Sequence, residues 1–212
     1  MKILTALGLS AALLVGCAGG RLEWTSEAGC KPYFDGGDGW MGCNFLQRNN
    51  AGLFVAPGTF LTHSLFYRAD LSGAQMASLL LYFDDFTLAD LSGANLQKSA
   101  FHYTSVDEAK FIDADLRDAW FWFSNARRAN FSDAILDGAN FDQTDLTSAK
   151  FVGASLRNVI FNAAVIDGVD FTDADLTGAS FSRDASEGGF SSVAPIYCRT
   201  TMPDRSVNND GC

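Results

Sequence analysis

The chain has 212 residues, of which 48% are hydrophobic and 19% are charged. This length suits one domain or two small ones, and the apolar content is sufficient for a buried core. The 25 acidic and 15 basic residues give a formal charge of −10, which argues against nucleic acid or an anionic membrane surface as a partner. Eighteen Phe and 20 Gly against four Pro argue against a disordered chain.

The amino-terminal segment has the pattern of an export signal. Lys2 precedes an apolar run over residues 3–15, which is too short to cross a hydrocarbon core of about 30 Å. The sequence Leu-Val-Gly-Cys at 14–17 resembles the lipobox of bacterial lipoproteins, which implies that residues 1–16 are a signal peptide and that Cys17 is lipidated. An ordinary signal peptide cleaved near Ala18 and an apolar amino-terminal helix are the alternatives. Because inner-membrane retention usually requires Asp after the lipidated Cys, Ala18 implies a lipid anchor in the outer membrane of a cell envelope.

Residues 59–183 repeat with a period of five. The middle residue of each five falls at 61, 66, 71 and onward to 181 without a slip, giving 25 pentapeptides. All 25 middle residues are apolar and 21 are Leu or Phe, while 21 of the 25 residues two positions earlier are Ala, Ser or Thr. The exceptions at the small positions are Leu79, Asp84, Val159 and Val169.

Neither a helix nor a flat strand gathers residues of this period on one side. In a helix the middle residues would scatter around the axis, and in a strand they would alternate between the two faces. A chain that turns a corner every five residues points all of them inward. The pattern Ala-(Asp/Asn)-Leu-X-X, as in residues 69–73, 89–93 and 174–178, resembles the pentapeptide-repeat family. The resemblance implies an all-β fold, a right-handed quadrilateral parallel β-helix with four pentapeptides per coil and about six coils.

Residues twenty apart are then expected to stack inside such a solenoid. One ladder contains Phe111, Phe131, Phe151 and Phe171, a second contains Phe101, Phe121, Phe141, Phe161 and Phe181, and a third contains Leu96, Leu116, Leu136, Leu156 and Leu176. Ala126 interrupts the fourth ladder, which predicts local slack or a small void there. An acidic residue at Phe141 should unfold the neighbouring coils.

The two flanks lack the repeat and are expected to cap the open ends of the solenoid. Residues 17–58 hold the lipidated Cys and Gly-rich turns, and residues 184–212 form the carboxy-terminal tail. Four further cysteines, Cys30, Cys43, Cys198 and Cys212, suit disulfides in an exported protein. Local pairing of Cys30 with Cys43 and of Cys198 with Cys212 is preferred among three connectivities, and a zinc site is the disfavoured alternative.

The sequence lacks the short motifs of nucleophilic, zinc-dependent and nucleotide-dependent enzymes. The acidic pair Asp84-Asp85 is interpreted as a solvated edge rather than an acid/base pair, although Asp84 occupies an inward position where a hydrogen bond to a turn would explain it. Asp35 and Asp38 lack the spacing of a calcium loop. No catalytic residue, metal or cofactor is therefore expected.

One face of the predicted solenoid carries aromatic residues where the other faces are polar. Its outward residues, hereafter the aromatic face, are Phe60, His63, Leu80, Tyr82, Phe83, His102, Tyr103, Trp120, Trp122 and Phe123, with Thr62 and Ala100 between them. A patch four coils tall is larger than a monomer normally leaves in water. Three coverings remain open: the aromatic-containing residues 18–58 folding back over it, a second copy of the chain, or a protein or glycan partner.

These features predict a lipid-anchored extracytoplasmic scaffold without enzymatic activity. Its partners would be the membrane, through the lipid, and a protein or a second copy, through the aromatic face. A second hypothesis is DNA mimicry, since some pentapeptide-repeat proteins are acidic rods that bind a type II topoisomerase, but the export signal and the basic residues scattered along the coils disagree with it. A third is binding of cell-wall glycan on the aromatic columns.

Overall fold

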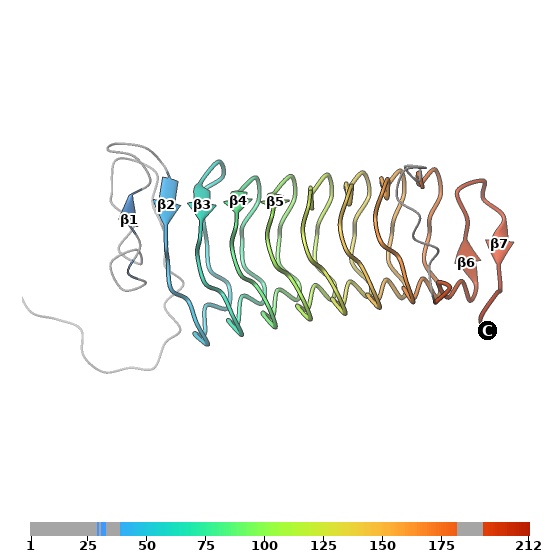
Figure 1. The fold of residues 1–212 in the computed structure, drawn as a ribbon, viewed down its shortest axis with the longest axis horizontal. Helices are drawn as coiled ribbons and strands as arrows, with labels where there is room; N and C mark the ends of the chain where they lie inside the picture. Colours follow the sequence, from blue (N-terminus) through green and yellow to red (C-terminus); the bar gives the residue numbers. More distant parts are fainter. Residues whose placement is uncertain (1–28, 30, 33–38, 182–192) are drawn as a thin grey trace, which may run out of the picture.

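The computed structural model describes residues 29, 31–32, 39–181 and 193–212, which form a row of stacked coils (Figure 1). These residues contain short strands, isolated bridges and turns. The strands are β1 (Lys31–Pro32), β2 (Gly39–Met41), β3 (Phe60–Thr62), β4 (Leu80–Tyr82), β5 (Ala100–His102), β6 (Thr200–Thr201) and β7 (Val207–Asn208). No described segment is a helix with the length and hydropathy needed to cross a bilayer.

Successive coils are joined by parallel pairing between residues twenty apart. In one coil the pairs are Asp90 with Lys110, Asn95 with Asp115, Ala100 with Trp120 and Ser105 with Asn125. Four pairing positions five residues apart in each coil agree with the predicted period, so residues of equal position in successive coils lie over one another. On one side the pairing widens into a sheet, in which β2, β3, β4 and β5 are parallel neighbours and β1 is antiparallel to β2.

The corners explain why Asp or Asn precedes the middle residue. The carboxylate of Asp70 accepts a hydrogen bond from the backbone N–H of Ser72 at 3.1 Å, and Asp175 accepts one from Thr177 at 3.0 Å. The residue two positions after the middle residue takes a left-handed conformation, as Gly73 does at φ 65° and Asp113 at φ 56°. Because Gly and Asp tolerate this conformation well, both are frequent there.

The inward residues form the predicted ladders. Phe141 is fully buried and stacks on Phe121 at 4.8 Å and on Phe161 at 5.5 Å between ring centroids. The two Phe ladders meet edge to face, with Phe131 lying 5.6 Å from Phe141 at 78°. Ala126 is fully buried in the fourth ladder, and the void predicted beside it stays a prediction. Phe181 differs from the expectation because it lies at the end of its ladder and is 39% exposed.

Coil stacking begins before residue 59, where the repeat pattern starts. Residues 39–58 pair in parallel with the next coil at a spacing of 21, since Asn44 pairs with Leu65 and Asn49 with Asp70. The expected cap therefore contains a coil of its own. Cys43 is buried and disulfide-bonded, whereas Cys30 lies outside the described residues.

The tail also continues the stack. Ile196 pairs with Asp170, Thr201 pairs with Asp175, and the Tyr197 ring lies on Phe171 at 5.7 Å. The β6–β7 hairpin and a disulfide between Cys198 and Cys212 then follow.

Replacing Phe141 by Ala should lower the free energy of unfolding by about 3–5 kcal/mol, because the ring is enclosed between two stacked neighbours and its loss leaves a cavity. Chemical denaturation of the full chain measures this. The matched control is Phe181→Ala in the same ladder, which should cost well under half as much since that ring is 39% exposed. Equal costs for the two variants would show that the ladder does not stabilise the coils through burial.

Candidate interaction face

The sheet formed by β2 to β5 underlies the aromatic face. Leu80, Phe83, Tyr103, Trp120, Trp122 and Phe123 are between 39% and 53% exposed, and His63 is also exposed. Phe60, Tyr82 and His102 are half-buried. Thr62 and Ala100, which were expected to point outward on this face, are buried.

The exposed rings stack along the direction in which the coils stack. In one column His63, Phe83, Tyr103 and Phe123 follow one another at 5.3, 5.1 and 5.3 Å. In the second column Tyr82 stacks on His102 at 4.8 Å, and His102 meets Trp122 edge to face at 5.6 Å. Rings lying flat on the surface, edge against edge, would have centroids further apart than these distances. The rings of the first column therefore cover each other's faces and present mainly their edges outward.

The face carries no formal charge at neutral pH. None of the residues at 60–63, 80–83, 100–103 and 120–123 is Asp, Glu, Lys or Arg. Burial lowers the pKa of His102, which favours the neutral imidazole. The ring of His63 exchanges a hydrogen bond with the Thr62 hydroxyl at 2.8 Å. The next coil ends the face with the polar residues Asn140, Asp142 and Gln143.

Residues 39–58 do not fold back over the aromatic face. Trp40 extends the sheet as part of β2, Phe45 stacks on Phe66 inside the solenoid, and Phe54 pairs with Gln75. Trp24, Tyr33 and Phe34 lie outside the described residues, as do Asp35 and Asp38. The pairing of β2 with β3 brings Trp40 and Met41 next to the face. The sequence pattern did not predict this extension, because residues 39–58 lack the regular repeat.

At several corners beside this face, a buried Ser hydroxyl hydrogen-bonds to the backbone of the preceding coil. Ser99 Oγ donates to the Met76 carbonyl at 2.6 Å and accepts from the Leu79 N–H at 3.2 Å. Ser124 Oγ makes the equivalent bridge, donating to the Phe101 carbonyl at 2.7 Å and accepting from the Thr104 N–H at 3.2 Å. The preference for Ser or Thr over Ala at these inward positions thus has a specific cause.

Asp84 occupies the same inward position as Ser124, two coils earlier at the same corner. Its Oδ1 accepts a hydrogen bond from the Ser64 N–H at 2.7 Å, as the serine hydroxyls accept from their corners. Its Oδ2 is buried without a hydrogen-bond partner. Burial raises the pKa of this carboxyl from 3.8 to about 7, against the lowering effect of backbone hydrogen bonds. The expectation that a hydrogen bond to a turn holds Asp84 agrees with this contact, whereas the interpretation of Asp84 as part of a solvated edge is wrong.

The stability of the protein should therefore fall as the pH rises from about 4 to about 7. Because the pKa of Asp84 is higher in the folded chain, its contribution is fully present below pH 3.8 and is lost as the pH rises through about 7. Raising the pKa from 3.8 to about 7 corresponds to a loss of about 4 kcal/mol in the free energy of unfolding across this pH range. Urea denaturation across this range measures it. Asp84→Asn and Asp84→Ser should both flatten the profile, and an unchanged slope in both variants would contradict the assignment.

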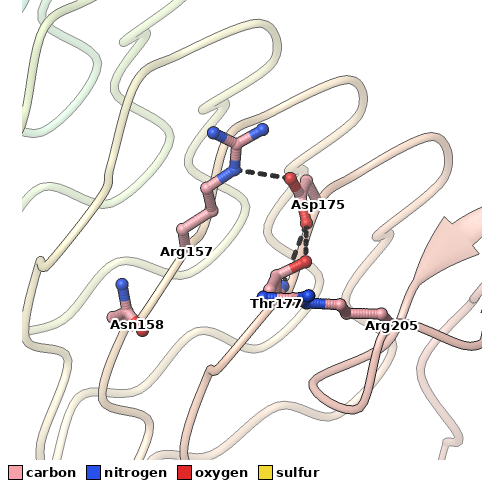
Figure 2. Close-up of a pocket in the computed structure, with 5 residues that line it drawn as sticks. All are labelled: Arg157, Asn158, Asp175, Thr177 and Arg205. Carbon is pink, nitrogen blue, oxygen red and sulfur yellow. Dashed lines mark hydrogen bonds and ion pairs between the residues drawn. The ribbon is translucent and has the colours of Figure 1, made fainter.

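A hollow near the carboxy-terminal end of the solenoid gathers several charged side chains. It measures about 410 Å³ and is lined by Arg157, Asn158, Asp175, Thr177 and Arg205 (Figure 2). Asp175 Oδ2 binds Arg157 Nε at 2.6 Å, and Oδ1 accepts from the Thr177 hydroxyl at 2.5 Å. Both carboxylate oxygens are thus engaged in contacts within the protein, and the arrangement offers no nucleophile or base.

Within the described residues, no three His, Cys, Asp or Glu side chains gather as a metal site requires. Asp85, the neighbour of Asp84, accepts a hydrogen bond from the Thr87 N–H at 2.9 Å in an ordinary corner.

Comparison with known proteins agrees with the coil geometry. Eight copies of the family model for pentapeptide repeats match residues 89–121, 124–162 and 145–183. The matched segments are pentapeptide repeats. No curated protein matches the chain.

Several solved structures are similar to the chain. One is trypsin-treated QnrB1, a plasmid-mediated fluoroquinolone resistance protein, at 18% identity and a TM-score of 0.44 over 66% of this chain and 72% of that one. A second is HetL, a pentapeptide repeat protein involved in heterocyst differentiation regulation in the cyanobacterium Nostoc, at 19% identity and a TM-score of 0.33 over 80% and 91% of the two chains. A third is a pentapeptide repeat protein of the Arabidopsis thaliana thylakoid lumen, at 26% identity and a TM-score of 0.22 over 58% and 81%.

Proposed function

We propose that this protein is a lipid-anchored extracytoplasmic scaffold without enzymatic activity, which holds an uncharged aromatic face at a fixed geometry. Its body would be a right-handed quadrilateral β-helix of about six coils with a cap at each end. The observation that carries the proposal is the continuous, exposed aromatic face on a rigid stack of coils, in a chain whose residues 14–17 resemble a lipobox. Lipidation at Cys17 would place the protein in the cell envelope, on the outer membrane.

A stack of coils suits such a role for a physical reason. Each coil is held by backbone pairing to both neighbours and by buried ladders of Phe and Leu, so outward side chains keep their spacing. Interaction surfaces gain affinity when their side chains are ordered before binding. The rings of the two columns pack on one another and are therefore ordered in the free protein.

The DNA-mimic hypothesis has less support. The charge of −10 favours it, but several acids are paired with arginines along the coils, including Asp145 with Arg127, Asp175 with Arg157 and Glu108 with Arg128. A DNA-like surface needs a continuous row of unpaired negative charge. Inhibition of DNA supercoiling by the purified chain would favour this hypothesis over the scaffold.

Glycan binding on the aromatic columns is also less favoured. Sugars stack on exposed ring faces, whereas the rings of Phe83 and Tyr103 lie 5.1 Å apart at 13° and cover one another. Only ring edges are then offered along this column.

Cys17→Ala should abolish incorporation of radiolabelled palmitate in bacteria that express the full chain, since the thiol is the proposed site of lipid attachment. The same substitution should shift the protein from the membrane fraction to the soluble fraction. Cys43→Ala is the matched control, because this buried cysteine lies within the solenoid and should leave the labelling unchanged. Equal palmitate labelling of the wild type and Cys17→Ala would overturn the lipid anchor.

A further inference from the structure

The aromatic face lies beside the point where the proposed tether enters the solenoid. Cys17 lies 14 residues before Lys31, the first residue of β1, which pairs with β2 at the edge of the sheet, and 14 residues span at most about 50 Å. The strand β2 belongs to the same sheet as β3, β4 and β5, which underlie the face, and these strands form one row (Figure 1). A lipid attached at Cys17 would therefore hold this side of the solenoid within reach of the bilayer.

The geometry points to the bilayer itself as the partner of the aromatic face. The face rests on the interfacial region of a membrane without net charge. The inference rests on the proposed lipid anchor and adds to it an orientation, with the sheet of β2 to β5 toward the lipid. Three properties of the face support this occupant over a protein partner.

The first property is charge. The protein carries −10 overall, so its other sides repel anionic headgroups, whereas the aromatic face contains no Asp, Glu, Lys or Arg. An uncharged surface can approach a zwitterionic bilayer without desolvating an ion.

The second property is the kind of aromatic residue. Tyr103, Trp120 and Trp122 are between 39% and 51% exposed, and each combines an apolar ring with one hydrogen-bond donor. Such residues are enriched at membrane interfaces, where the ring enters the apolar region and the donor contacts headgroups or water. Leu80 and Phe83 add purely apolar surface beside them.

The third property is shape and size. Consecutive rings lie 5.1 to 5.3 Å apart in the column from His63 to Phe123, which leaves no slot for a side chain of a partner. Protein interfaces depend on a few anchors that fill pockets, whereas fluid lipid needs none. Four coils and four residues make a face of about 19 by 13 Å.

The test uses the mature chain, residues 17–212, carrying Cys17→Ser and an amino-terminal polyhistidine tag. Vesicles of phosphatidylcholine with nickel-chelating lipid then hold the protein whether or not Cys17 is lipidated in cells. The variant Trp24→Phe serves as background, so that emission comes from Trp40, Trp120 and Trp122. Phosphatidylcholine brominated on its acyl chains quenches tryptophan that enters the bilayer.

We expect a blue shift of the emission and strong quenching by the brominated lipid. Phe83→Asp, which puts a charge on the face, should at least halve the quenching. Ser148→Asp is the matched control because both positions have a left-handed conformation, at φ 58° and φ 59°, and Ser148 lies on another face. Asp occurs at this corner position in Asp113 and Asp173, so both variants should fold, and circular dichroism checks this.

Two results would overturn the inference. Emission of the tethered protein that the brominated lipid does not quench would show that the face points away from the bilayer. A dimer in light scattering that Phe83→Asp converts to a folded monomer would show that a second copy covers the face. Failure of the palmitate experiment with a positive quenching result would remove the lipid anchor and leave the membrane-facing surface, so the two proposals fail separately.

Discussion

The structure depends on the register of twenty residues between neighbouring coils. Because each residue from 60 to 180 lies over its equivalent twenty residues away, one choice of side chain is repeated as a column, whether inward or outward. Inward columns of Phe, such as Phe121, Phe141 and Phe161, become buried stacks, and outward columns such as Phe83, Tyr103 and Phe123 become exposed ones. The same backbone pairing thus produces both the core and the candidate interaction face.

The pentapeptide period was sufficient to predict the solenoid, its ladders and the columns of the aromatic face, because the register converts sequence spacing directly into position. It failed at the ends. Residues 39–58 form a coil although Arg48 and Asn50 stand where the pattern expects a small and a large apolar residue. Backbone pairing does not depend on side-chain type, and within the described residues this coil stacks on one other coil only. The pattern also could not show that Thr62 and Ala100 are buried, because it gives the side on which a residue lies but not how its neighbours pack.

Ring stacking limits what the aromatic face can bind. A column of rings at about 5 Å gains its order from contacts between the ring faces, and those contacts are then withdrawn from any ligand. Edges of rings remain, together with the donors of Trp and Tyr. Such a surface is ordered, lacks Asp, Glu, Lys and Arg, and is closely stacked along its column, which fits a fluid apolar medium better than a partner with protruding side chains.

Asp84 connects the core to this face. It follows Phe83 directly, and its carboxyl lies in the corner that Ser64 begins, where the equivalent corners contain Ser99 and Ser124 hydroxyls. A hydroxyl always carries the proton that it donates to the corner carbonyl, whereas a carboxyl carries one only when neutral. The free oxygen of Asp84 therefore ties the packing of this corner to the pH, and the adjacent Phe83 is 53% exposed at the edge of the face. Phe83 is also the second ring of the column that runs from His63 to Tyr103, so the buried carboxyl of Asp84 directly adjoins the exposed column.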